Sequence, residues 1–118
     1  MELTGNGYLN GCMENYRKKK VIIIFGCGNY GRILGEYLVK NKISSFVGFC
    51  DNSKEKIGTK IMGNKKVFSL EEVLTEYPSA YFVVTPKYGH DDIITQLISN
   101  GVLCDNIELF VTPYCDFI

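Results

Sequence analysis

Short, continuous apolar runs alternate along the chain with longer segments in which apolar residues recur at helical spacing. Residues 21–25, with the sequence VIIIF, are β-branched or aromatic throughout, which is typical of a strand buried on both faces of a parallel sheet. After a glycine-rich turn, apolar residues return at positions i, i+3, i+4, i+7 and i+8 and predict a helix with one apolar stripe. These residues are Tyr30, Ile33, Leu34, Tyr37 and Leu38.

The same alternation continues along the rest of the chain. Further apolar runs predict strands at residues 46–50, 67–68, 80–84 and 107–111. A polar segment rich in lysine and glycine separates the second run from the third and predicts a loop over residues 52–64. The first 19 residues have no sustained period and predict a flexible leader or a weak helix, with no sign of a contribution to the core.

Two more helices are predicted from their start and stop signals. Ser69 and Glu72 have the spacing of a capping box, and Pro78 ends the apolar stripe that follows them. A third helix begins at Asp91 or Asp92, and Gly101 is placed to end it in the left-handed conformation. Strands that alternate with helices of this length require a mainly parallel sheet. The sequence therefore predicts an α/β fold, a Rossmann-like three-layer α/β/α domain with a five-stranded sheet over residues 20–118.

Composition narrows the function classes. The 118 residues include 13 basic and 13 acidic side chains, so the net charge is zero, whereas binding to nucleic acid or to a membrane surface usually needs a basic excess. The run Arg17-Lys18-Lys19-Lys20 is as well explained by a solvated lead-in to the first strand as by a phosphate contact. We therefore expect neither nucleic acid nor a membrane as a partner.

The cysteines and the amino-terminal residues bear on location. There are 5 cysteines, an odd number, and none has the C-x-x-C spacing of a zinc site or a disulfide framework. Residues 1–20 lack the apolar core of a signal peptide, and the longest apolar run is too short to span a membrane. These features predict a reduced, cytoplasmic protein without a metal site.

The turn after the first strand carries the pattern G-x-G-x-x-G in the context that the motif requires, between a strand and a helix. Gly26 permits the sharp exit from the strand, Gly28 lets the backbone approach a pyrophosphate, and Gly31 lets the helix pack closely on the sheet. Backbone N–H groups of Asn29, Tyr30 and Gly31 then point at the phosphates, with the helix dipole behind them.

Polar residues follow two other predicted strands at the same edge of the sheet. Asp51 ends the second strand, where its carboxylate is placed to accept hydrogen bonds from a ribose and to repel a 2′-phosphate, so NAD is favoured over NADP. Asn52 lies beside it, and Thr85 and Pro86 follow the strand that should neighbour the first, so these three residues are also predicted to line the cofactor site. Thr85 is explained equally well by a ribose or phosphate contact and by a capping turn. A domain whose glycines serve only packing is the alternative to a nucleotide site.

Together the segments VIIIFGCGNYGRILGEYL, FVGFCDNS, KVFSLEEVL and YFVVTPKYGHDDIITQLISNGV resemble three groups of Rossmann domains. One is the amino-terminal domain of the glucose–fructose oxidoreductase and inositol dehydrogenase type. Another is the nucleotide-binding domain of bacterial surface-polysaccharide enzymes, among them the sialic-acid-type sugar acyltransferases and the sugar-nucleotide dehydratases. The third comprises small Rossmann segments attached to sugar- or phosphocholine-transferring proteins and to methyltransferases.

The resemblance implies a cofactor or nucleotide-sugar module more than a complete enzyme. In the oxidoreductases the segment that matches residues 85–90 lies beside the nicotinamide, and a second domain supplies a catalytic lysine and histidine. His90, the sole histidine, is read as a helix-entry residue, and Cys27 has no base nearby in the sequence. We therefore expect no catalytic residue in this chain.

The sequence thus predicts a module that binds NAD or a nucleotide-sugar in a sugar or surface-polysaccharide pathway. One alternative is the cofactor half of an NAD-dependent sugar oxidoreductase or dehydratase, and another is a ligand-free Rossmann domain that serves assembly. The apolar end at Phe117 and Ile118 favours contact with a further catalytic domain or a second copy of the chain.

Overall fold

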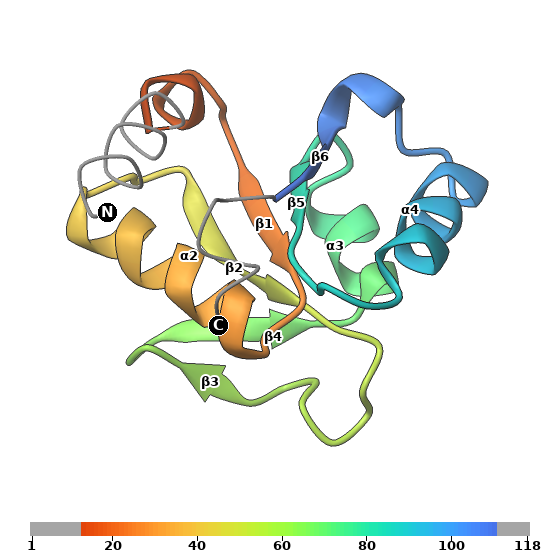
Figure 1. Cartoon of the computed structure of the whole chain (residues 1–118), viewed down its shortest axis with the longest axis horizontal. Coiled ribbons are helices and arrows are strands. Elements are labelled where there is room, and N and C mark those ends of the chain that lie inside the picture. Colours follow the sequence, from red (N-terminus) through yellow and green to blue (C-terminus); the bar gives the residue numbers. More distant parts are fainter. Residues whose placement is uncertain (1–12, 111–118) are drawn as a thin grey trace.

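The computed structural model describes residues 13–110 and contains a six-stranded sheet with helices on both faces (Figure 1). The strands are β1 (Ile22–Phe25), β2 (Phe46–Cys50), β3 (Lys60–Ile61), β4 (Lys65–Phe68), β5 (Tyr81–Val84) and β6 (Ile107–Leu109). The helices are α2 (Asn29–Lys40), α3 (Leu70–Glu76), α4 (His90–Ser99) and the short 3-10 helix η1 (Cys104–Asn106). Residues 13–17 are also helical.

The strand order is β3-β4-β2-β1-β5-β6, and every neighbouring pair is parallel except β3 with β4. The Rossmann-type three-layer prediction is confirmed, but the predicted number of five strands is wrong by one. The extra strand, β3, lies inside the segment predicted as a polar loop. Its two residues pair antiparallel with Lys65 and Lys66 across a turn in which Met62 and Gly63 have positive φ. Such a strand exists only because the exposed edge of β4 offers it a partner.

The helix ends follow the predicted local chemistry. Ser69 accepts a hydrogen bond from the backbone N–H of Glu72, whose side chain accepts one from the N–H of Ser69, so the capping box is confirmed. Gly101 has φ +91° and donates its N–H to Ile98, while Val102 donates to Leu97. These two bonds form a Schellman motif, in which glycine is the usual left-handed residue.

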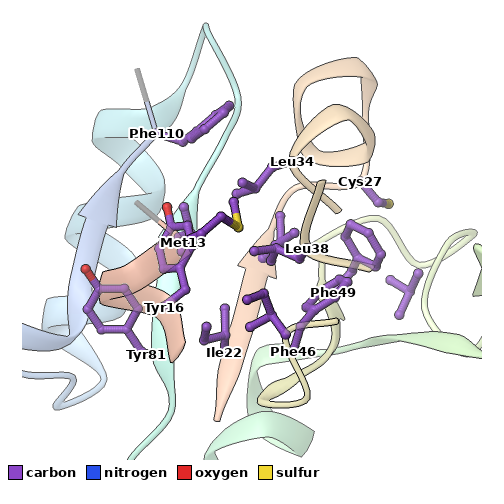
Figure 2. Packing of buried hydrophobic residues seen from close by; sticks show 14 residues of the cluster. Met13, Tyr16, Ile22, Cys27, Leu34, Leu38, Phe46, Phe49, Tyr81 and Phe110 are labelled. Carbon is purple, nitrogen blue, oxygen red and sulfur yellow. The ribbon is translucent and has the colours of Figure 1, made fainter. Parts of the chain in front are cut away.

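Alternate residues of the strands fill two separate apolar layers. Ile23 and Phe25 face α3 and α4, and the buried residues of that layer are Ile23, Phe25, Cys50, Phe68, Leu70, Val73, Ala80, Phe82, Val84 and Leu97. Ile22 and Ile24 face α2, and that layer is drawn in Figure 2. A right-handed crossover from β1 to β2 places α2 over one half of this face. The half over β5 and β6 therefore needs another cover.

Residues 13–17 provide part of that cover. The side chains of Met13 and Tyr16 are 2% and 0% exposed and pack beside Ile22, Tyr81 and Phe110 (Figure 2). The expectation that residues 1–19 contribute nothing to the core is wrong for these two side chains. A helical segment this short has too few apolar positions to show a period, so only the uncovered face of the sheet reveals its role. The predictions for residues 1–12 and 111–118 fall outside the described residues.

Two further features concern membrane spans and the state of the cysteines. Within residues 13–110, none of the helices has the length and apolar character needed to cross a membrane. The described cysteines, Cys27, Cys50 and Cys104, carry free thiols. The reduced, cytoplasmic setting stays a prediction.

Candidate functional site

The carboxyl ends of β1, β2 and β5 meet at one edge of the sheet. Phe25, the last residue of β1, pairs with Cys50 on one side and Val84 on the other. The N–H of Gly26 donates to the carbonyl oxygen of Cys50 at 2.8 Å, and the N–H of Thr85 donates to that of Phe25 at 3.1 Å. The three predicted site segments, residues 26–31, 51–52 and 85–86, therefore lie at the same edge.

Two of the turn glycines are required by the fold. Gly26 has φ +110°, and a Cβ atom there would lie 2.8 Å from the Thr85 hydroxyl oxygen and 2.9 Å from the Pro86 ring. A Cβ on Gly31 would lie 1.9 Å from the carbonyl oxygen of Gly26. Gly31 thus permits the start of α2 to approach the exit of β1, as the motif predicts.

Gly28 is different, because neither packing nor conformation requires a glycine there. Its φ is −82°, which any residue adopts, and a Cβ would meet nothing within 4 Å. Gly28 is the N-cap of α2, where serine, threonine, aspartate or asparagine would cap the helix better. A ligand that packs directly against the main chain at Gly28 would need this open space.

The amino terminus of α2 also lacks the negative charge that the other long helices carry there. Its first turn has no acidic residue and its N-cap makes no side-chain hydrogen bond. The first turn of α3 contains Glu71 and Glu72, and that of α4 contains Asp91 and Asp92. The first hydrogen bond within α2 runs from the N–H of Arg32 to the carbonyl of Gly28. The backbone N–H groups that precede Arg32 in α2 have no carbonyl one turn earlier in the same helix to accept them. This terminus therefore suits an anion.

Asp51 lies directly across from the turn and is held by it. Its Oδ2 accepts hydrogen bonds from the backbone N–H of Cys27 at 3.3 Å and from the Cys27 thiol at 3.2 Å. Its Oδ1 accepts the N–H of Ser53 at 2.9 Å. A carboxylate has about four acceptor positions, so these donors leave about one for a ligand. The thiol is the weakest of the three donors, and a ribose that displaced it would have a second acceptor position of the carboxylate available.

This network separates the ionisation of the two side chains. Partial burial raises the pKa of Asp51, but the N–H of Ser53, the thiol and N–H of Cys27 and the positive charge of Lys56 outweigh it, so the net pKa is below its usual value. Burial, then the hydrogen bond and charge of Asp51, raise the pKa of Cys27 to about 11. At neutral pH the carboxylate is therefore charged and the thiol protonated, so Cys27 is a hydrogen-bond donor and not a nucleophile.

An Asp51→Asn variant tests this assignment. Because the folded-state pKa of Asp51 is lowered, ionised Asp51 stabilises the fold above its unfolded pKa, and this contribution is lost as the pH falls through the folded value. We expect the variant to be less stable than the wild type at pH 7 and the difference to shrink below about pH 4. Urea unfolding across this range measures it, and parallel stability curves would contradict the assignment.

Two of the predicted site residues have partners within the protein. The Thr85 side chain is 3% exposed, and its hydroxyl lies 3.1 Å from the carbonyl oxygen of Phe25 and 3.3 Å from that of Gly26. Thr85 thus holds the turn in place with its buried hydroxyl, for which the sequence left both a ribose or phosphate contact and a capping turn open. The amide of Asn52 exchanges two hydrogen bonds with that of Gln96 in α4.

The sequence analysis missed two cations beside the turn. The Nε of Arg32 donates to the carbonyl of Cys27 at 3.1 Å. The charges of Arg32 and Lys56 both lower the pKa of Cys27, so both lie near the turn. Arg32 directly follows the last glycine of the motif, a position from which its proximity to the turn was predictable. Lys56 lies in the loop after β2, and only the folded loop places it here.

His90 is the first residue of α4, as a helix-entry residue should be. Its Nδ1 lies 3.0 Å from the carbonyl oxygen of Lys87 and its Nε2 lies 3.5 Å from Asp91. Among the described residues no group of three or more histidine, cysteine or acidic side chains is arranged to hold a metal ion.

Comparison with known protein families assigns residues 20–107 to the oxidoreductase family with an NAD-binding Rossmann fold. The chain belongs to this family. The match confirms the predicted resemblance to the glucose–fructose oxidoreductase and inositol dehydrogenase type, since that is the group this family represents. The chain therefore carries an NAD-binding Rossmann domain, whereas the resemblance to sialic-acid-type acyltransferases and dehydratases is not confirmed. None of the curated proteins compared with the sequence matches it.

Several solved structures have the same fold. A Rex-family repressor named RSP superimposes with a TM-score of 0.63 at 18% identity, covering 95% of this chain and 62% of the repressor. The same repressor with β-NADH gives 0.60 at 18% identity, with coverages of 95% and 63%. Its complex with β-NAD+ and operator DNA gives 0.59 at 17%, with coverages of 95% and 60%. The chain thus spans less than two thirds of these proteins.

Proposed function

We propose that the turn at residues 26–31 binds the pyrophosphate of NAD and that Asp51 binds a ribose hydroxyl. The observation that carries this proposal is Gly28, which faces open space at an uncharged helix terminus and is not required there by packing or by conformation. In this proposal the amides of Asn29, Tyr30 and Gly31, in the first turn of α2, donate to the phosphates. The repressor with the same fold has been solved with NADH and NAD+, which supports NAD as the ligand.

The other residues at this edge have positioning roles in the proposal. Thr85 ties the exit of β1 to β5 through the carbonyls of Phe25 and Gly26, and the ring of Pro86 packs against Gly26. The paired amides of Asn52 and Gln96 connect the loop after β2 with α4. Arg32 adds positive charge beside the turn. These contacts prepare the turn before a ligand arrives.

NAD supplies hydride transfer when it is bound, and the residues described here supply binding and orientation. We propose that the chain is the cofactor-binding part of an oxidoreductase whose substrate-binding and proton-transferring groups come from a further domain, a partner or a second copy. A role in sugar or surface-polysaccharide synthesis, with a nucleotide-sugar held by the same turn, is the alternative, because that turn would accept any diphosphate. We also propose that the protein is cytoplasmic and has no nucleic-acid partner. The zero net charge supports the second of these proposals.

A thermal-shift experiment with NAD, NADH, NADP, UDP-sugars and CMP-sugars tests the proposal. Ligand at ten times its dissociation constant stabilises the folded state by about 1.4 kcal/mol, which raises the melting temperature by several degrees. We expect the shift with NAD and NADH, and its loss in Gly28→Val, whose side chain would occupy the open space, and in Asp51→Ala. Asp105→Ala, an exposed aspartate in η1, is the matched control and should keep the shift.

The outcomes separate the alternatives. A shift with a nucleotide-sugar but not with NAD would favour the polysaccharide pathway, and no shift with any ligand would favour an assembly domain. If the shift with NAD persists unchanged in both Gly28→Val and Asp51→Ala, the site lies elsewhere.

A further inference from the structure

A hollow of about 410 Å³ lies at the opposite end of the sheet from the glycine turn. The segments that precede β1 and β2 lie side by side there, joined by a hydrogen bond from the N–H of Ile22 to the carbonyl of Ser45 (Figure 1). Its lining contains four cationic and two hydroxyl side chains, which are Arg17, Lys19, Lys20, Lys42, Ser44 and Ser45.

The hollow concentrates positive charge that nearby acids do not balance. No acidic residue lines it, and within residues 13–110 neither Lys20 nor Lys42 has an ion-pair partner. Arg17 donates to the carbonyl of Asn41 at 3.3 Å, and the Lys19 ammonium lies 4.2 Å from the centre of the Tyr81 ring. Neither contact neutralises a charge. Because the whole chain has a net charge of zero, this local excess does not simply reflect composition.

Lys42 occupies a backbone position that favours glycine. It has φ +56°, and its N–H donates to Val39 while that of Ile43 donates to Leu38. This is the Schellman motif that Gly101 forms at the end of α4, with lysine in place of glycine. A left-handed conformation is unfavourable for a residue with a Cβ. The backbone conformation therefore does not explain a lysine at position 42. The place of this residue in the lining of the hollow does explain it.

We propose that this hollow binds a small oligophosphate anion, at a site separate from the glycine turn. Ammonium, guanidinium and hydroxyl groups are the side-chain donors that phosphate oxygens prefer. The volume is within the range of small-molecule sites. The cations gather in one hollow and do not form the extended stripe that would follow a nucleic-acid backbone, which favours a compact anion. For the run of residues 17–20 the sequence left solvation and phosphate contact open, and the proposal assigns Arg17, Lys19 and Lys20 to a phosphate contact.

Titration calorimetry with inorganic triphosphate on the full chain tests the proposal. We expect binding at low ionic strength that weakens strongly near 1 M salt, where the Debye length falls to about 3 Å. Lys20→Ala and Lys42→Gly should each weaken it about tenfold, because each removes a charged hydrogen bond. Lys42→Gly should leave the melting temperature unchanged or raise it by a few degrees, which separates lost binding from lost folding.

Two control variants locate the bound triphosphate. Lys60→Ala removes an exposed charge of β3 that does not line the hollow, and Gly28→Val blocks the turn proposed for NAD, where a second triphosphate could otherwise bind. Both variants should leave the affinity of the hollow within about twofold. Binding that is lost in Gly28→Val but kept in Lys42→Gly would place the anion at the turn and overturn the proposal. So would the absence of triphosphate binding, or binding of a single-stranded oligonucleotide alone with the same dependence on Lys20 and Lys42.

Discussion

Replacing Gly31 by alanine is expected to destabilise the fold by about 3 kcal/mol or more, because the new methyl group has no room. Its Cβ would lie 1.9 Å from the carbonyl oxygen of Gly26 and 3.1 Å from the Thr85 hydroxyl oxygen. The nearest of these atoms belongs to the main chain. Gly26 is itself held by its hydrogen bond to Cys50, so relief requires α2 to move away from β1.

Gly28→Ala is the matched control for this prediction, with the same added methyl group only three positions away. Nothing lies within 4 Å of its Cβ, so the cost should be at most about 1 kcal/mol, the typical loss when alanine replaces a better N-cap. Urea unfolding of both variants by circular dichroism measures the difference. Similar losses in the two variants would show that the turn is not packed as described.

Replacing Tyr16 by alanine is expected to cost about 3–5 kcal/mol, the range for emptying a large aromatic side chain from a core. Tyr16 is 0% exposed and packs over Ile22 and Tyr81 (Figure 2). Its hydroxyl also donates to the Glu108 carboxylate at 2.6 Å, while Tyr81 donates to the other carboxylate oxygen at 2.7 Å. The helical segment at residues 13–17 is thereby connected to β5 and β6.

Tyr16→Phe separates the ring from the hydroxyl. It keeps the packed ring and removes one hydrogen bond to a carboxylate that retains Tyr81, so we expect a loss of about 1.5 kcal/mol. Unfolding free energies of the two variants, compared at pH 7, measure both contributions. A loss below about 1 kcal/mol for Tyr16→Ala would mean that residues 13–17 do not pack against the sheet in solution.

Much of the fold was predictable because its signals are local. The run at residues 21–25 is apolar throughout because β1 lies between two neighbouring strands and both of its faces are covered by apolar layers. The capping box at Ser69 and the left-handed residue at Gly101 depend on a few adjacent residues and are confirmed. The strand β3 and the core role of Tyr16 were missed because they depend on partners far away in the sequence.

The site shows the same division. The pattern of Gly26, Gly28 and Gly31 before a helix predicted the turn, and parallel strands predicted that Asp51 would lie across from it. The sequence left the role of Thr85 open, because a hydroxyl at a strand end serves a ligand or a capping turn equally well, and it predicted Asn52 as a residue of the site. Only the folded chain shows Thr85 bonded to the carbonyls at the exit of β1 and Asn52 paired with Gln96.

The sequence by itself determined the alternation of strands and helices, the parallel sheet that this alternation requires and the edge of the sheet at which polar residues gather. Periodicity and turn chemistry act over a few residues, so they can be read along the chain. The tertiary structure alone decided which glycine faces open space, what covers the open half of the sheet and that Arg17, Lys19 and Lys20 line one hollow with Lys42. Those outcomes depend on which distant atoms share a small volume, and no local pattern records that.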